Sequence, residues 1–179
     1  MDSSSFRFCG AKVVARPLTG RLVKGYTFDF DPRRPQFHVF PDRAASGEPA
    51  LVFARELKAV FFVRDLGGNP QCRERKYFRR GEGVAGRRIE VTLLDGEQLV
   101  GTAEDVVPGA HYVPFVPVDP DSNNLRVYAA RPAIVAVRYV SDRFSGRVRT
   151  APVAADAPAP APNPELLPLQ LRTWLATKA

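Results

Sequence analysis

The segment between residues 64 and 87 holds side chains that could bind an anion. It places basic residues beside aromatic ones: Arg73, Arg75, Lys76, Tyr77, Phe78, Arg79 and Arg80. Guanidinium and ammonium groups pair with phosphates, and aromatic rings stack on bases, so this combination suits single-stranded nucleic acid or a nucleotide. A solvated linker whose aromatic rings tuck against a neighbouring domain has the same composition. The sequence leaves both interpretations open.

The spacing of two of these arginines narrows the kind of anion. Arg75 and Arg79 stand four positions apart, just before a segment that is expected to form β-strands. This spacing resembles half of the cyclic di-GMP motif of PilZ domains, which implies a cyclic dinucleotide as one ligand. The other half of that motif, Asp/Asn-x-Ser-x-x-Gly, has no match, because residues 104–109 lack the serine.

The rest of the chain shows no arrangement typical of an enzyme. His38 and His111 stand at unrelated positions, and no Ser-His-Asp or Cys-His pair and no glycine-rich phosphate loop follows from the spacing. Cys9 and Cys72 are too few and too far apart for a metal knuckle or a disulfide framework. Asp29 is expected to be a turn residue whose carboxylate accepts hydrogen bonds from backbone N–H groups. We therefore expect no catalytic, cofactor-binding or metal-binding residues.

The elements that must position these residues occur twice. Residues 12–55 match residues 88–131 without a gap at a shift of 76 positions, so that Arg55 meets Arg131. A one-residue insertion then moves the shift to 77. The shared positions are glycines, prolines, aspartates and alternating apolar residues. A repeat of about fifty residues indicates one supersecondary unit per copy, and units this small are expected to pack on each other.

Each copy reads as five short strands with no helical periodicity. In the first copy the strands are expected at residues 12–18, 21–30, 37–40, 51–54 and 58–63. Thr19-Gly20 and Asp31-Pro32 mark turns between them. A glycine inside the second strand, Gly25, promotes a sharp bend. These features predict an all-β protein built from two small, strongly curved five-stranded barrels.

The spacing of the shared residues resembles the first half of an Sm-like, or more broadly SH3-like, barrel. The matching residues are Val14, Leu18, Gly20, Gly25 and Asp31 in the first copy and Val91, Asp95, Gly96 and Gly101 in the second. Residues 51–63 look like the second half. The chain also resembles, over 28–42 and 58–70, an uncharacterised family of small bacterial proteins. The Sm-like resemblance implies association through edge strands and an RNA site, for which only Arg55 and Arg131 remain as candidates.

The end of the chain differs in composition from both copies. Residues 151–164 are rich in alternating alanine and proline, which is typical of an extended, disordered spacer. Four apolar residues follow that share one face if a short helix forms from Leu169: Leu167, Leu171, Trp174 and Leu175. This is the form of a tethered docking peptide. The alternative is that the segment folds back and covers an open edge of one barrel.

Together these features predict a domain order and a function. The expected parts are 1–63 (first barrel), 64–87 (basic connector), 88–140 (second barrel) and 141–179 (tail). The net charge of +7 comes from the first copy and the connector, and no apolar run of membrane-spanning length or signal peptide is apparent, which favours the cytoplasm. We predict a non-enzymatic adaptor that binds a protein partner. The alternative is binding of RNA, single-stranded DNA or a cyclic dinucleotide by the connector and first barrel.

Overall fold

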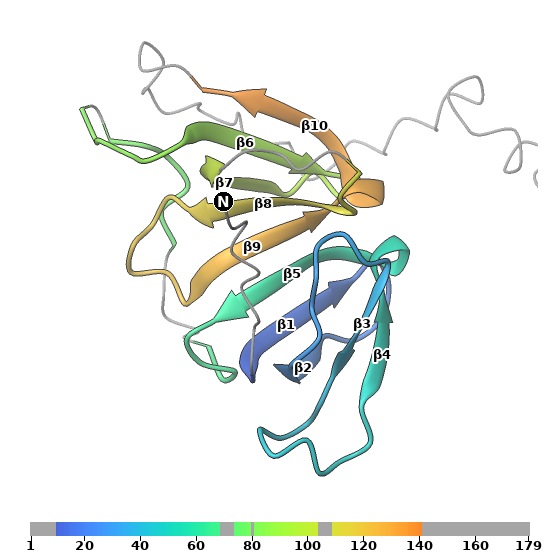
Figure 1. Ribbon diagram of the computed structural model, residues 1–179. Helices are drawn as coiled ribbons and strands as arrows, with labels where there is room; N and C mark the ends of the chain where they lie inside the picture. Colours follow the sequence, from blue (N-terminus) through green and yellow to red (C-terminus); the bar gives the residue numbers. More distant parts are fainter. Residues whose placement is uncertain (1–9, 69–73, 80, 104–108, 141–179) are drawn as a thin grey trace, which may run out of the picture. The chain divides into compact units, whose positions relative to one another are not determined.

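The computed structural model describes residues 10–68, 74–79, 81–103 and 109–140, and it confirms the prediction of an all-β protein (Figure 1). The strands are β1 (Ala11–Pro17), β2 (Val23–Thr27), β3 (Gln36–Val39), β4 (Ala50–Phe53), β5 (Leu57–Val63), β6 (Arg87–Leu93), β7 (Gln98–Ala103), β8 (Tyr112–Pro117), β9 (Asn124–Ala130) and β10 (Ile134–Tyr139). Two short 3-10 turns, Ala54–Glu56 and Arg131–Ala133, precede β5 and β10. No helix in this part of the chain is long and apolar enough to span a membrane.

Eight of the ten strands in the described residues, from both copies, form one antiparallel sheet. Its order is β10-β6-β7-β8-β9-β5-β1-β2, and β3 pairs with β4 in a separate two-stranded sheet. A bridge connects β2 to the end of β3, where the backbone N–H groups of Tyr26 and Phe40 each donate to the other residue's carbonyl at 2.8 Å. Each copy therefore has the same internal order of strands: fifth, first, second, third and fourth.

The strand register shows where the insertion between the copies lies. The equivalent end pairs are Gln36 with Phe53 in β3–β4 and Tyr112 with Ala130 in β8–β9. The shift is therefore 76 in the third strand but already 77 in the fourth, because the loop between them is one residue longer in the second copy. The gap-free match to residue 55 is wrong in this last part. Arg131 corresponds to Ala54 rather than to Arg55.

Neither copy closes into the five-stranded barrel that the sequence predicts. In the described residues β4 does not pair with β5, and β9 does not pair with β10. The fifth strand of the first copy pairs instead with the fourth strand of the second, in five residue pairs from Ala59–Ala129 to Val63–Asn124. The two copies are therefore open units joined edge to edge. The predicted tail and its short helix lie outside the described residues.

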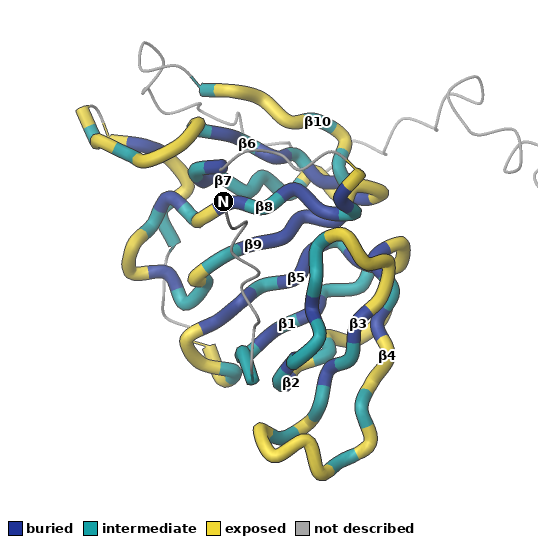
Figure 2. Tube along the Cα trace, viewed as in Figure 1, coloured by how far each residue is buried: buried dark blue, intermediate teal, exposed yellow. Residues whose placement is uncertain are grey.

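Both faces of β5 are buried because the strand contributes to two cores (Figure 2). Val60 and Phe62 belong to the core of the first copy, and Ala59 and Phe61 pack in the core of the second. β9 contributes to both cores in the same way, with Tyr128 and Ala130 in the first and Val127 and Ala129 in the second. Each core therefore contains side chains from both copies.

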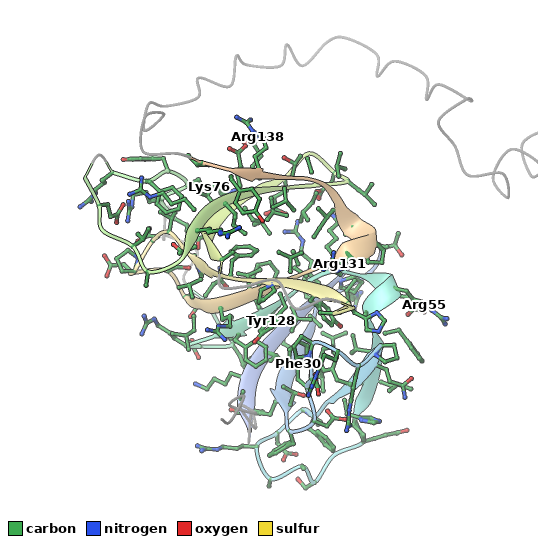
Figure 3. The ribbon with its side chains drawn as sticks, turned by 45° about the horizontal axis from the view of Figure 1, so that its top comes forward. Phe30, Arg55, Lys76, Tyr128, Arg131 and Arg138 are labelled. Carbon is green, nitrogen blue, oxygen red and sulfur yellow. The ribbon has the colours of Figure 1, made fainter. Side chains whose placement is uncertain are left out.

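Phe30 is the centre of the aromatic packing in the first core. Its ring centroid lies 4.8–5.5 Å from those of Phe37, Phe62, Tyr112 and Tyr128. Two of these rings come from the first copy and two from the second, and Figure 3 shows Phe30 beside Tyr128. Tilted and edge-on ring pairs at this distance stabilise a core beyond the area that they bury. The aromatic contacts therefore connect the copies as the strand pairing does.

The bend glycines occupy equivalent crossings of the second and third strands. A Cβ on Gly25 would lie 2.0 Å from the carbonyl oxygen of Phe40, and a Cβ on Gly101 would lie 2.2 Å from that of Val116. Backbone atoms cannot yield at these distances. Glycine at both positions therefore permits the close approach that curves each copy.

Replacing either bend glycine with alanine should destabilise the whole described unit. We expect Gly25→Ala and Gly101→Ala each to lower the free energy of unfolding by about 1–3 kcal/mol, the usual cost of overpacking. Gly83→Ala is the matched control, because nothing lies within 4 Å of the position that its Cβ would take and its change should stay within about 0.5 kcal/mol. Urea unfolding measures all three, and equal small effects would contradict the close approach.

Candidate protein-interaction site

Two strand edges lack a partner in the described part of the chain. β10 pairs there with β6 alone, and β4 pairs with β3 alone. Each therefore presents a row of backbone N–H and C=O groups on its other side. Such edges accept an added strand from another segment or another chain.

The β10 edge also carries apolar side chains. Val135, Val137 and Tyr139 are all exposed, and Figure 2 draws most of this strand in the colour of exposed residues. The Arg87 guanidinium lies over the Tyr139 ring, 5.8 Å from its centroid. Arg138 lies 3.9 Å from Glu90 and projects from the strand (Figure 3). Exposed apolar residues gathered on one element make this edge a candidate interaction surface.

The β4 edge has a smaller apolar surface. Leu51 is exposed, whereas Val52 next to it is buried in the first core. Arg55 follows in the 3-10 turn and points away from the sheet (Figure 3). Its guanidinium lies 5.1 Å from the centroid of the Phe53 ring and 3.5 Å from a carboxylate oxygen of Glu56. The charge of this predicted RNA contact is therefore shared with an acid on the same turn.

Arg75 of the connector is held in place by protein groups. Its guanidinium makes two hydrogen bonds of 2.8 Å to the Glu82 carboxylate and donates to the carbonyl of Val118 at 2.7 Å. Its backbone N–H donates to Asp119 at 2.8 Å, and only 10% of its side chain is exposed. Hydrogen bonds from the Arg75 guanidinium, together with one from the backbone N–H of Arg79, lower the pKa of Glu82 from 4.5 to about 2. Arg75 therefore clamps the connector to the β8–β9 turn.

The other predicted connector residues divide into three groups. Lys76, Tyr77 and Arg79 are exposed, as an anion contact requires. Phe78 is buried beneath the Arg88 guanidinium, 5.0 Å from its ring centroid, as the linker interpretation expects. Two predicted residues, Arg73 and Arg80, lie outside the described residues. Anion binding by this segment stays a prediction.

An open groove of about 550 Å³ has one of the exposed connector residues, Lys76, in its lining. Its apolar lining includes Val14, Phe61 and Leu99. Its charged lining is mixed, with the basic residues Arg16, Lys24 and Lys76 and the acidic residues Asp65, Glu74 and Glu97. This balance of charge does not select an anion.

Asp29 and His38 form a polar pair in the first copy. The Nδ1 atom of His38 lies 2.7 Å from one Asp29 oxygen, and the backbone N–H of His38 donates to the other at 3.0 Å. Burial raises the pKa of Asp29, but the hydrogen bonds from His38 outweigh it and the net pKa is lowered. In the described part of the chain, no cluster of three or more His, Cys, Asp or Glu side chains could hold a metal ion.

The predicted docking residues of the tail cannot be placed in the fold. Leu167, Leu171, Trp174 and Leu175 all lie outside the described residues. Their role in binding stays a prediction. The site that sequence reasoning missed is the β10 edge. Val137 and Tyr139 repeat the apolar types of Val60 and Phe62, which marks the two strands as equivalent but does not show that one is exposed and the other buried.

The described residues define an all-β protein made of a duplicated five-strand unit, with open strand edges at β10 and β4. Residues 10–141 match a family of unknown function, DUF6982, and the chain belongs to that family. The match spans both copies and the connector between them, and it agrees with the resemblance to an uncharacterised family. No curated protein and no solved structure matches the chain.

The Arg75–Glu82 pair should stabilise the fold in a pH-dependent way. We expect Arg75→Ala to lower the free energy of unfolding at pH 7 by about 1.5–3 kcal/mol, as for lost hydrogen bonds to charged groups. Arg79→Ala, on the exposed side of the same segment, should change it by less than about 0.5 kcal/mol.

The pKa of Glu82 sets the pH range of that effect. A carboxyl whose pKa is lower in the folded state contributes stability above its unfolded pKa and loses it as the pH falls through the folded value. The difference between the parent chain and Arg75→Ala should therefore shrink as the pH falls from 4.5 towards about 2. Urea unfolding at several pH values measures this, and a constant difference would place the role of Arg75 elsewhere.

Proposed function

We propose that the protein is a non-enzymatic adaptor in which two Sm-like, or SH3-like, units form one platform for protein partners. The exposed β10 edge, with Val135, Val137 and Tyr139, is the observation that carries this proposal. The order of strands within each copy and the equivalent bend glycines support the Sm-like assignment. The units are open rather than closed.

An open edge with alternating apolar side chains suits the addition of a strand. The backbone groups of the edge supply hydrogen bonds, and the side chains on either face of the strand select the partner's sequence. On β10 the alternate positions Val137 and Tyr139 provide apolar contacts. Arg138 between them provides a charge. A partner strand with apolar residues at alternate positions fits this surface.

The tail would act as a second contact. Its four apolar residues follow an alanine- and proline-rich spacer, which holds a docking peptide near the platform without a new rigid interface. Two linked contacts raise the overall affinity above that of either one. Trp174 is the natural anchor, because tryptophan is favoured among the residues that dominate binding energy.

The nucleic-acid alternative rests on a smaller surface. Lys76, Tyr77 and Arg79 remain exposed, but the Arg75 guanidinium is already paired with the Glu82 carboxylate. The described residues therefore favour a protein partner over RNA, single-stranded DNA or a cyclic dinucleotide. Nucleic acid that co-purifies with the protein and is removed by nuclease treatment would reverse this preference.

Affinity purification from cells that make the protein tests the adaptor function. We expect Val137→Lys and deletion of 164–179 each to reduce co-purified protein at least about tenfold, a loss of about 1.4 kcal/mol. The melting temperature should stay unchanged, because Val137 lies on an exposed edge. Arg79→Ala is the control and should retain the partner. Partners that survive both changes, or a tail deletion that lowers the melting temperature, would contradict the proposal.

A further inference from the structure

The pairing of β5 with β9 leaves one edge of each of the two equivalent strands unpaired in the described residues. β5 is the fifth strand of the first copy and β9 the fourth strand of the second. The remaining strands of these kinds are β10, the fifth of the second copy, and β4, the fourth of the first. In the described residues both have an open edge. We propose, building on the adaptor function, that β10 of one molecule pairs with β4 of a second copy as β5 pairs with β9.

The side chains on β10 repeat those that β5 buries. Val137 and Tyr139 correspond to Val60 and Phe62, so both positions keep a β-branched and an aromatic residue. Val60 and Phe62 are 0% and 4% exposed, whereas Val137 and Tyr139 are 38% and 60% exposed. Each pair faces a strand of its own copy in the same register, Val60 opposite Ala15 and Val137 opposite Val91. Among the strands that the structure describes, β10 differs from β5 in having no strand on its other side.

The opposite edge offers an apolar residue at the matching position. In the internal pairing, Tyr128 of β9 stands opposite Val60 and its ring lies 5.3 Å from that of Phe62. The residue of β4 that corresponds to Tyr128 is Leu51, which is 45% exposed. Leu51 of a second copy would therefore cover Val137 and Tyr139 as Tyr128 covers Val60 and Phe62. Each open edge carries the apolar surface that the other needs.

A β-bulge fixes the register of both fifth strands. The pairing with the first strand skips Lys58 in β5 and Val135 in β10 at equivalent positions. Beyond the bulge the strands correspond residue by residue. The expected pairs are Ala136 with Val52, Val137 with Leu51 and Arg138 with Ala50 of the second copy.

The new contact should be weaker than the internal one. Pro49 corresponds to Arg126, which pairs with Phe62 in the internal contact. Proline lacks the N–H that a ladder needs, so the pairing ends at Ala50. Three residue pairs replace five, and association should depend on concentration. Because the two edges differ, the contact is head to tail and leads to a closed ring or a longer chain of molecules.

The mass of the full chain in solution tests the association. Sedimentation velocity over about 1–200 µM, the range of a micromolar contact, should show species at multiples of 19.8 kDa that grow with concentration. Val137→Lys should return the protein to 19.8 kDa with an unchanged melting temperature. Val135→Lys is the matched control and should still associate, because the corresponding residue of β5 is already a lysine, Lys58.

Cysteine cross-linking tests the register and the direction. Directly opposite residues of an antiparallel pair are about 4.5–5.5 Å apart at Cα, within the range of a disulfide. In a background of Cys9→Ser and Cys72→Ser, mixing Leu51→Cys protein with Val137→Cys protein should give one disulfide-linked dimer under mild oxidation. The chain with both cysteines should give a ladder of covalent oligomers. Each single variant alone should remain monomeric on a non-reducing gel.

Two outcomes would overturn the proposal. A single species of 19.8 kDa at every concentration with no cross-link would show that β10 and β4 do not pair between molecules. Dimers of Val137→Cys protein alone would show two-fold pairing of β10 with β10. In either case a different co-purified protein that depends on Val137 would leave the adaptor function standing. Association without any other partner would support self-assembly and remove the wider adaptor role.

Discussion

The pairing of β5 with β9 is the interaction on which the described fold depends. It joins the copies through five residue pairs and buries both faces of each strand. A fully buried valine or phenylalanine contributes about 1.5–3 kcal/mol. A unit of about fifty residues is close to the lower limit for independent folding, because it buries too little apolar surface by itself. Each completes its core with side chains from the other.

Polar contacts between the copies gather around the same pairing. At one end, the backbone N–H of Arg64 donates to the carbonyl of Asn123, and the Asn123 side chain bonds the backbone of Asp65 in both directions. At the other end, Lys58 and Arg16 contact acids in the β6–β7 turn. Arg75 then holds the connector to the β8–β9 turn through its hydrogen bonds to Val118 and Asp119. These contacts give the pairing a single arrangement.

The sequence predicts local structure here well and long-range pairing poorly. Alternating apolar residues and the bend glycines Gly25 and Gly101 indicate the strands, because both act within one element. Whether β5 pairs inside its own copy or with β9 depends on residues about seventy positions away, and the same strand pattern serves both. The insertion lies in the loop between the third and fourth strands, whereas comparison of the two copies places it after residue 55. The comparison fails there because loop residues have no periodicity. No sequence motif indicates that Arg75 pairs with Glu82.

The β10 edge illustrates the same limit at the candidate site. Val137 and Val60 are the same residue at equivalent positions, so their sequence cannot show that one is exposed and the other buried. Only the strand order shows that the edge of β5 is paired and that of β10 is open in the described residues. The difference in exposure between the two fifth strands therefore comes from their place in the strand order. Within the described part of the chain, the joining of the copies leaves one edge open on β10, the second copy's fifth strand, and on β4, the first copy's fourth.

Native-state hydrogen exchange tests most directly whether the copies fold as one unit. If the β5–β9 pairing is essential to both cores, the slowest amides of β1 and β6 should open with the same free energy and the same dependence on denaturant as those of β5 and β9. One shared value across the four strands is the expected result. Two distinct values for β1 and β6, with faster exchange along β5 and β9, would show that the copies are independent domains in loose contact.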